Sequence, residues 1–390
     1  MTNAQFAFGA AETGSAGLRA ARVTRVESIP VMLPLRKHFE HAIGGKRLNL
    51  ENLIVRLYTD QGLVGLGETQ AWRRIGSSDT LRGLKAAIDD ILAPQLVGRA
   101  VFDAPAILWD FDQALHGSHY AKAPLADALL DLQGQLLGVP ASALLGGQSR
   151  QSIPISAVLP ITRDLQQDVE AGMALFERGF RSFVVKVSPD GGAVQTIQQL
   201  RSALPEAVIR LDANASMDFA GARRLSDAVA DCDIEGFEQP LPPWDVEGMA
   251  LLAQLTKIPI IADECVVTAQ DLLRVIQTRA AFGFQSKVAK NGGAWRSRDL
   301  WSIGAAAGLK IYPGNHPGTS IVTASVAHLA AAWSGPLMEG PFAVGVTDEF
   351  APEVVVEPLT IKGNLLQVPN RPGLGMTIDE KALEKYRIDR

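Results

Sequence analysis

The hydrophobic pattern of the chain changes character near residue 150. Before that point, two runs with β-type composition, residues 23–35 and 52–60, precede the stretch GLVGLGET. The QG pair at 61–62 lies where a hairpin turn would join the second run to that stretch. Helical stretches are expected at 78–95, 103–115 and 121–137, the last with apolar residues at three- and four-residue steps. This half of the chain therefore predicts an α+β domain that begins with an antiparallel sheet.

After residue 150, short β-rich runs alternate regularly with amphipathic stretches of helix length. The eight runs are 153–159, 182–187, 207–212, 234–238, 258–263, 283–288, 309–313 and 336–339. A helix follows each of the first seven, which predicts a parallel β/α barrel. An open doubly wound sheet is the alternative, but it usually has a glycine-rich first turn that this sequence lacks. The tail after residue 355 holds one more strand pair, LTIKG and LLQVP, which we expect to return to the first domain.

Composition and charge narrow the classes of function. The 390 residues are 47% hydrophobic and 20% charged, with a net charge of −5 that gives no general attraction to nucleic acid or anionic membrane. No apolar run is long enough to span a bilayer, and the first twenty residues lack the pattern of a secretory signal. Cys232 and Cys265 lack metal-site spacing and are expected to be reduced. We therefore expect a cytoplasmic protein, a homo-oligomer that binds a small carboxylate and neither nucleic acid nor membrane.

Acidic residues end three successive strands of the predicted barrel. Asp212, Glu238 and Asp263 each close an apolar run, and Glu264 follows the last. Strand ends converge on one face of a β/α barrel, so these carboxylates would repel one another without a cation between them. Oxygen ligands suit Mg²⁺ or Mn²⁺. The alternative is that each acid caps the helix that follows it.

Two lysines end strands on opposite sides of the predicted ring. Lys186 ends the second strand and Lys287 the sixth, with the acidic strands along the arc between them. Strand-end lysines are often merely solvated. Two lysines beside a metal, however, are suited to removing a proton from the carbon next to a carboxylate, because the cation stabilises the resulting enolate.

Several segments together resemble the muconate lactonizing subgroup of the enolase superfamily. RLDANAS, GFEQPLPP and IIADEC are similar to the three metal-ligand segments of that family, and QSKVAKNGG to its sixth-strand lysine segment. YAKAPLADALLDLQGQLLGVPASALLGG and RPGLGM resemble the helix that closes the family's cap and its C-terminal return. The resemblance implies a lysine base with Mg²⁺, the established chemistry of the superfamily. It also implies substrate or neighbouring roles for Asn214 and Glu264.

The resemblance implies a modified (β/α)7β TIM-type barrel with an N-terminal α+β capping domain. On this basis we expect an extension at 1–21, the capping domain at 22–150, the barrel at 151–345, and a C-terminal segment at 346–390 that returns to the cap. The loops that cover the barrel mouth would include 37–47 and 72–74. Lys46, Arg73 and Arg74 are therefore candidates to pair with a second substrate carboxylate, although solvated surface charge is the simpler interpretation.

Departures from the family pattern bear on the specific reaction. Val184 stands where the family usually has the first lysine of Lys-x-Lys, whereas Lys186 keeps the second. Glu339, in MEGPFAVGVTDE, falls in the segment where muconate cycloisomerases carry a glutamate. LMEGP lacks the Asp-x-Asp with which dipeptide epimerases hold an amino group. His316 has no aspartate partner on the sixth strand, so it is expected to be a substrate contact or a loop residue and not a base.

The sequence therefore favours a muconate-type cycloisomerase and leaves three alternatives open. A racemase or epimerase of an amino-acid derivative would use the same two lysines. An acid-sugar dehydratase is a third possibility, although such enzymes more often use histidine. A catalytically silent binding or assembly protein is the alternative outside enzymes, and the intact acids and lysines argue against it.

Overall fold

The computed structural model describes residues 21–41, 45–71, 79–159, 164–189, 192–340 and 351–389, and the side chains of these residues outside 37–47. Within these ranges, none of the helices has the length and apolar character needed to cross a membrane. Arg73 and Arg74 lie outside the described residues, and the side chain of Lys46 does too.

The chain begins with an antiparallel sheet in the order β1-β2-β3, as the sequence predicts. Its strands are β1 (Val23–His41), β2 (Gly45–Thr59) and β3 (Val64–Gln70). Gly62, with a φ of +78°, lies in the turn between β2 and β3. The helices that follow are α2 (Leu81–Ala86), η1 (Ala87–Leu92), α3 (Ala93–Leu96), η2 (Val101–Asp103), α4 (Ala104–Ala114), α5 (His119–Leu137) and α6 (Ala141–Leu144).

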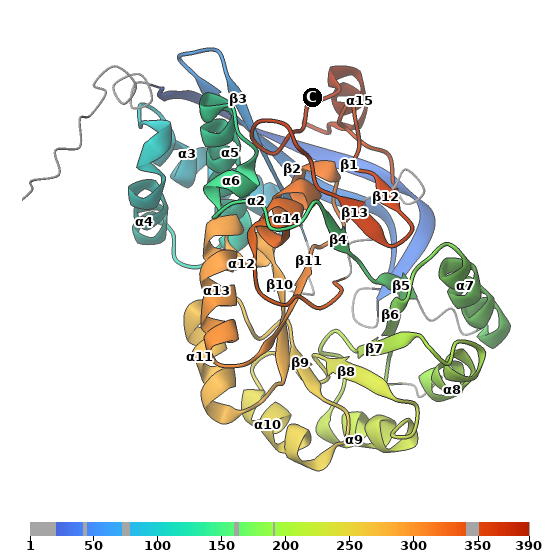
Figure 1. Ribbon diagram of the computed structural model, residues 1–390. Helices are drawn as coiled ribbons and strands as arrows, with labels where there is room; N and C mark the ends of the chain where they lie inside the picture. The colour runs from blue at the N-terminus through green and yellow to red at the C-terminus, as the bar shows by residue number, and fades with distance from the viewer. Residues whose placement is uncertain are drawn as a thin grey trace, which may run out of the picture.

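Helix α5 packs directly on β3. Gly67 permits this, since a Cβ there would collide with the backbone of Pro124 in α5. Figure 1 shows α5 between the first sheet and the helices of the second half, α12 and α14. Most of α5 is buried, because it has the cap on one side and the barrel on the other.

Seven parallel strands form the second sheet, in the unbroken order β11-β10-β9-β8-β7-β6-β5. They are β5 (Ala157–Leu159), β6 (Ser182–Lys186), β7 (Val208–Asp212), β8 (Ile234–Glu238), β9 (Ile260–Ala262), β10 (Gly283–Lys287) and β11 (Lys310–Gly314). A doubly wound sheet would reverse its strand order, so that alternative is wrong. The predicted fold, a modified TIM-type barrel with an N-terminal α+β domain, is confirmed.

A short segment fills the eighth place in the ring. The Met338 amide donates to Ile311 O at 2.9 Å, and the Ser156 amide donates to Gly340 O at 2.8 Å. Residues 338–340 therefore bridge the two edges of the sheet, near the eighth strand expected at 336–339. Helices surround the barrel on the outside (Figure 1): α7 (Leu165–Glu177), α8 (Ala193–Ala203), α9 (Phe219–Ala228), α10 (Val246–Leu255), α11 (Ala269–Thr278), α12 (Val288–Asn291), α13 (Ala294–Ala306) and α14 (Ser320–Ala332).

The C-terminal segment contacts both halves of the chain. Strands β12 (Ile361–Lys362) and β13 (Leu365–Gln367) form a small antiparallel sheet with β4 (Ser152–Pro154) at the start of the barrel. Helix α15 (Glu380–Tyr386) then lies beside β1, and the Ile388 amide donates to Pro30 O at 3.0 Å. Figure 1 shows the C-terminus beside the first sheet.

Candidate active site

The three acids predicted to bind metal lie side by side at the C-terminal ends of adjacent strands. Asp212 is the last residue of β7, Glu238 is the last of β8, and Asp263 follows β9 directly. Asp212 and Glu238 are partners in the strand register. All three are at most 3% exposed. Each strand thus uses its last inward position to place a carboxylate on the same face of the barrel.

Helix capping does not explain these acids. The helices after β7, β8 and β9 have the N-cap residues Asp218, Asp245 and Thr268. Their side chains each accept an amide in the first turn of α9, α10 and α11. The capping alternative is therefore wrong for all three strand-end acids, whose burial needs another reason.

The two predicted lysines flank the acids from both sides. Lys186, at the end of β6, forms an ion pair with Asp212 and donates to Asn214 Oδ1 at 3.1 Å. Lys287, at the end of β10, is buried and forms an ion pair with Asp263. The interpretation as solvated lysines is therefore wrong. Each ammonium group contacts one outer carboxylate, and Glu238 lies on the strand between them.

Burial shifts the pKa values of three carboxyl groups in this cluster, and neighbouring lysines outweigh that shift only for Asp263. Burial, with the charge of Asp212 next, raises the pKa of Glu238 to about 8. Burial and the charge of Asp263 do the same for Glu264, also to about 8. Burial would raise the pKa of Asp263 as well, but the ammonium groups of Lys287 and Lys290 outweigh it and lower that pKa.

The donor set fits a divalent cation. Glu238 Oε2 and Glu264 Oε2 are buried and accept no hydrogen bond from the described residues. Among the described residues, no three acidic, histidine or cysteine side chains are grouped so that they could hold a metal ion as they stand. Ammonium groups lie against Asp212 and Asp263 instead. A metal would have to replace those ion pairs. A small hard cation with oxygen ligands is the partner that such buried carboxylates require.

The backbone turns sharply just after the acids. Asn214 and Gln239 have φ values of +44° and +34°, a region that non-glycine residues adopt rarely and often at functional sites. The Asn214 amide donates to Asp212 Oδ1 at 2.8 Å, and its side chain reaches Glu264 Oε1 at 3.3 Å. Asn214 and Glu264, both predicted site residues, are thus brought into the cluster.

Three neighbouring residues were missed by the sequence reasoning. Lys290 donates to Asp263 Oδ1 at 2.7 Å and is 1% exposed. Gln239 Oε1 accepts the Asp263 and Cys265 amides at 2.9 and 3.2 Å. Arg210 Nε lies 3.3 Å from Glu238 Oε2. The signals were present, because Lys290 lies one helical turn after Lys287, and Arg210 lies two strand positions before Asp212 on the same face.

His316 and Glu339 lie in different parts of the barrel. His316 follows β11 and is buried, with its Nδ1 3.2 Å from the Tyr120 hydroxyl of α5. The charges of Asp263 and Glu264 act on that same tyrosine, which places the pair near the acids. Burial and then the charge of Glu235 raise the pKa of Glu339, so Glu339 lies toward Glu235 at the N-terminal end of β8, whereas the acid Glu238 is at the C-terminal end.

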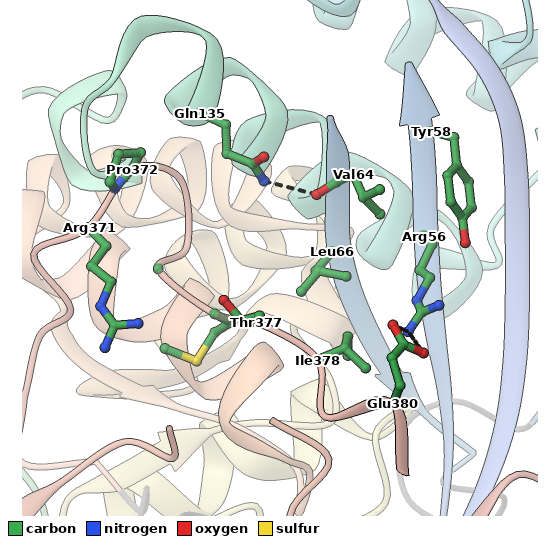
Figure 2. Close-up of a pocket in the computed structure, with 12 residues that line it drawn as sticks. Arg56, Tyr58, Val64, Leu66, Gln135, Arg371, Pro372, Thr377, Ile378 and Glu380 are labelled. Atoms are coloured by element: carbon green, nitrogen blue, oxygen red, sulfur yellow. Dashed lines mark hydrogen bonds and ion pairs between the residues drawn. The ribbon is translucent and has the colours of Figure 1, made fainter. Parts of the chain in front are cut away.

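A large cavity lies away from the acids. It has a volume of about 700 Å³ and is lined by residues of β2, β3, α5 and the C-terminal segment. Figure 2 shows that Arg56 and Glu380 close one side of it with an ion pair, while Arg371 and Pro372 lie opposite. None of its lining residues is a predicted site residue. The cavity therefore lies at the interface between the first sheet and the C-terminal segment.

Comparisons with known proteins agree along nearly the whole chain. Residues 26–146 match the family described as mandelate racemase / muconate lactonizing enzyme, N-terminal domain, and residues 167–382 match the enolase C-terminal domain-like family. Muconate cycloisomerase 1 of Pseudomonas putida is 30% identical, over 93% of this chain and 96% of its own. L-Ala-D/L-Glu epimerase of Bacillus subtilis is 29% identical, over 91% and 96%. The structure of muconate lactonizing enzyme from Pseudomonas fluorescens complexed with muconolactone has a TM-score of 0.88 at 28% identity, covering 95% of this chain and 100% of that one.

Proposed function

The chain belongs to the mandelate racemase/muconate lactonizing enzyme family, and on this premise we propose that it is a muconate-type cycloisomerase that requires a divalent metal. It is an isomerase of the enolase superfamily. The observation that carries the proton chemistry is the placement of Lys186 and Lys287, from opposite flanks, on the outer two of three buried carboxylates. The similarity to muconate cycloisomerases favours cycloisomerisation as the specific reaction. The substrate is proposed to be a small carboxylate.

The residues divide the chemistry between them. Asp212, Glu238 and Asp263 would hold the metal, Mg²⁺ or Mn²⁺, which supplies electrostatic stabilisation of the enolate when bound. Lys186 and Lys287 would then reach a substrate carbon held beside those carboxylates from either face. In a cycloisomerase, one lysine moves the proton at that carbon. The other stabilises the negative charge that develops on the substrate carboxylate.

Racemisation or epimerisation is the second candidate. The same opposed lysines can remove a proton from one face and return it to the other, and a relative of similar identity is an epimerase. The absence of Asp-x-Asp in LMEGP argues against dipeptides as substrates. We therefore propose the cycloisomerase first, and an acylated or otherwise blocked amino acid as the substrate class if the reaction is a racemisation.

Metal dependence tests the proposal common to both reactions. Protein treated with excess chelator should lose activity on carboxylate substrates and regain it with Mg²⁺ or Mn²⁺. Asp212→Ala, Glu238→Ala and Asp263→Ala should each lower turnover by at least about a thousandfold while the far-UV circular dichroism stays unchanged. Glu247→Ala, at an exposed ion pair on α10, is the matched control and should keep full activity. Full turnover in chelator would contradict the proposal.

Isotope exchange separates a catalyst from a binding protein. A metal-loaded catalyst should exchange an α-proton with deuterated water, on the amino-acid substrate in a racemase and on the lactone in a cycloisomerase, and mass spectrometry detects this even when no net product forms. A catalytically silent scaffold would bind without exchange. A panel of dienoic diacids, blocked amino acids and acid sugars, read by ultraviolet absorbance, optical rotation and carbonyl formation, then distinguishes cycloisomerase, racemase and dehydratase.

A further inference from the structure

The interior of the barrel beneath the acids is polar. We call Arg210, Gln285, Tyr312 and Glu339 the barrel-core cluster. Arg210 is 1% exposed, and none of its three guanidinium nitrogens has a hydrogen-bond partner among the described residues. The same holds for both amide atoms of Gln285, the Tyr312 hydroxyl and Glu339 Oε2. Interiors of β/α barrels are usually filled by layers of branched apolar side chains, so this cluster is a departure that needs an explanation.

The members of the cluster adjoin one another and the acids. The Arg210 guanidinium carbon lies 4.6 Å from the centre of the Tyr312 ring. Gln285 and Tyr312 are partners in the strand register of β10 and β11. Arg210 Nε lies 3.3 Å from Glu238 Oε2, the charge of Arg210 acts on Glu235, and the charge of Glu235 acts on Glu339. The cluster therefore extends from Glu235 and Glu339 up to the carboxylate of Glu238.

Hydrogen-bond capacity identifies what completes this cluster. A guanidinium carries five N–H donors, an amide NH₂ two and a phenol one, so donors outnumber the unpartnered oxygens nearby. An added anion would meet the charges of Glu235, Glu238 and Glu339. Water both accepts and donates, adds no charge, and commonly completes buried polar groups in proteins.

We propose that ordered water fills the barrel-core cluster and that Arg210 is a positioning residue, which holds Glu238 in the orientation needed to bind a metal. This rests on the metal site of the proposed function. Arg210 forms an ion pair with Oε2 of Glu238, and water held by Gln285 and Tyr312 would fix the guanidinium from below. Groups that orient a metal ligand are worth about tenfold or more in metal affinity.

The direction in which metal affinity changes when Arg210 is removed distinguishes a positioning role from an effect of its charge alone. Arg210 is a cation close to a cation site, so if it acted only through its charge, removing it would strengthen metal binding. If it positions Glu238, removing it weakens binding. A purely structural role would lower stability and leave the affinity of the folded protein unchanged.

Titration calorimetry with Mn²⁺ alone on the purified full-length protein provides the test. Arg210→Met should weaken Mn²⁺ binding about tenfold. Gln285→Met and Tyr312→Phe should weaken it less, and they keep the test open if Arg210→Met fails to fold. Arg274→Met, at an exposed ion pair on α11, is the matched control and should bind as the wild type does. Unchanged or tighter binding by all three cluster variants would overturn the positioning role.

The two levels of failure are distinguishable. If the wild-type protein binds no Mn²⁺, the metal site of the proposed function fails. If it binds Mn²⁺ and the cluster variants bind equally well, only the role of Arg210 fails. A crystal structure at about 1.5 Å resolution tests the hydration separately, and we expect ordered waters against the Arg210 and Gln285 side chains. Direct pairing of Arg210 with Glu235 or Glu339 in a dry core would overturn it.

Discussion

At the scale of single residues, the two lysines differ in their surroundings although they occupy equivalent strand ends. Lys186 is 13% exposed and shares Asp212 with Asn214, whereas Lys287 is more deeply buried and shares Asp263 with Lys290. Burial alone would lower the pKa of Lys287, but the charges of Asp263, Glu238 and Glu264 together raise it. A metal that neutralises these acids would remove that effect. The pKa at which Lys287 acts as a base is therefore the one it has with the metal bound.

Substitution of each lysine should reveal the reaction type. In a cycloisomerase, Lys186→Ala and Lys287→Ala should differ, one eliminating α-proton exchange and the other slowing it by about 10²–10⁴-fold. In a racemase, each variant should stop racemisation yet still exchange the α-proton of one enantiomer, and not the same one. Deuterium incorporation measured by mass spectrometry checks this. Wild-type exchange in both variants would show that another group is the base.

We expect the side chain of Gln239 to hold the backbone at Asp263 in place. Its Oε1 accepts two buried amides, those of Asp263 and Cys265. Gln239→Leu leaves both donors unpaired and should lower the free energy of unfolding by about 2–4 kcal/mol. Mn²⁺ binding should weaken as well, because Asp263 loses its backbone anchor. Urea unfolding and calorimetry check this against Gln198→Leu, an exposed control. Equal effects of the two substitutions would contradict the prediction.

At the scale of elements, the N-terminus of α14 joins three parts of the chain. Glu68 of β3 accepts the Thr319 and Val322 amides at 2.9 and 3.1 Å. Glu353, from the C-terminal segment, accepts the Ser320 amide at 3.1 Å. Carboxylates at a helix N-terminus interact favourably with its free amides and dipole. One helix end of the barrel thus holds both the cap and the C-terminal segment.

Glu353 should make stability depend on pH. Burial, partly opposed by hydrogen bonds from Ser320, raises its pKa from 4.5 to about 7, and the nearby Glu68 contributes. The folded state therefore binds a proton more tightly than the unfolded state. This stabilisation is complete below about pH 4.5 and is lost as the pH rises through 7, by up to about 3 kcal/mol.

Urea unfolding at several pH values between 4.5 and 8 checks this expectation. Glu353→Gln should remove this part of the fall in unfolding free energy, so the difference between variant and wild type should grow with pH. Glu384→Gln, on the outward side of α15, is an exposed control and should leave the slope as it is. A wild-type slope retained in Glu353→Gln would assign the dependence to other groups.

Helices and strands could be predicted from the sequence where the local hydrophobic pattern alone determines them. Strands expected at 182–187, 207–212 and 234–238 appear as β6, β7 and β8 with ends shifted by at most one residue. The eighth run at 336–339 forms only bridging bonds, because a closing strand depends on its neighbours more than on its own sequence. Lys186, Asp212 and Glu238 were found because they end strands. Arg210 and Gln239 were not, because their roles depend on which side chain the register brings opposite.

At the scale of the whole molecule, buried acids join the cap to the barrel. Asp127 of α5 accepts the Ala294 amide at the start of α13, at 2.8 Å. Asp131, one turn later, accepts the Leu66 amide of β3 at 2.8 Å and the Leu374 amide of the C-terminal segment at 2.7 Å. These bonds connect residues far apart in the sequence, so they favour cooperative unfolding of cap and barrel.

Asp131→Ala should weaken this cooperation. It leaves the buried amides of Leu66 and Leu374 without an acceptor, so the free energy of unfolding should fall by about 2–4 kcal/mol. Four of the six tryptophans, among them the fully buried Trp301 of α13, belong to the barrel half of the chain, so tryptophan fluorescence weights barrel unfolding, while far-UV circular dichroism reports all helices. In the wild type the two signals should change together, and in Asp131→Ala the dichroism should begin to change at lower urea. Asp110→Ala, at a partly exposed ion pair with Arg99 within the cap, is the control and should cost less than about 1 kcal/mol. Coincident transitions in Asp131→Ala, at the wild-type midpoint, would show that packing of α5 alone holds the two halves together.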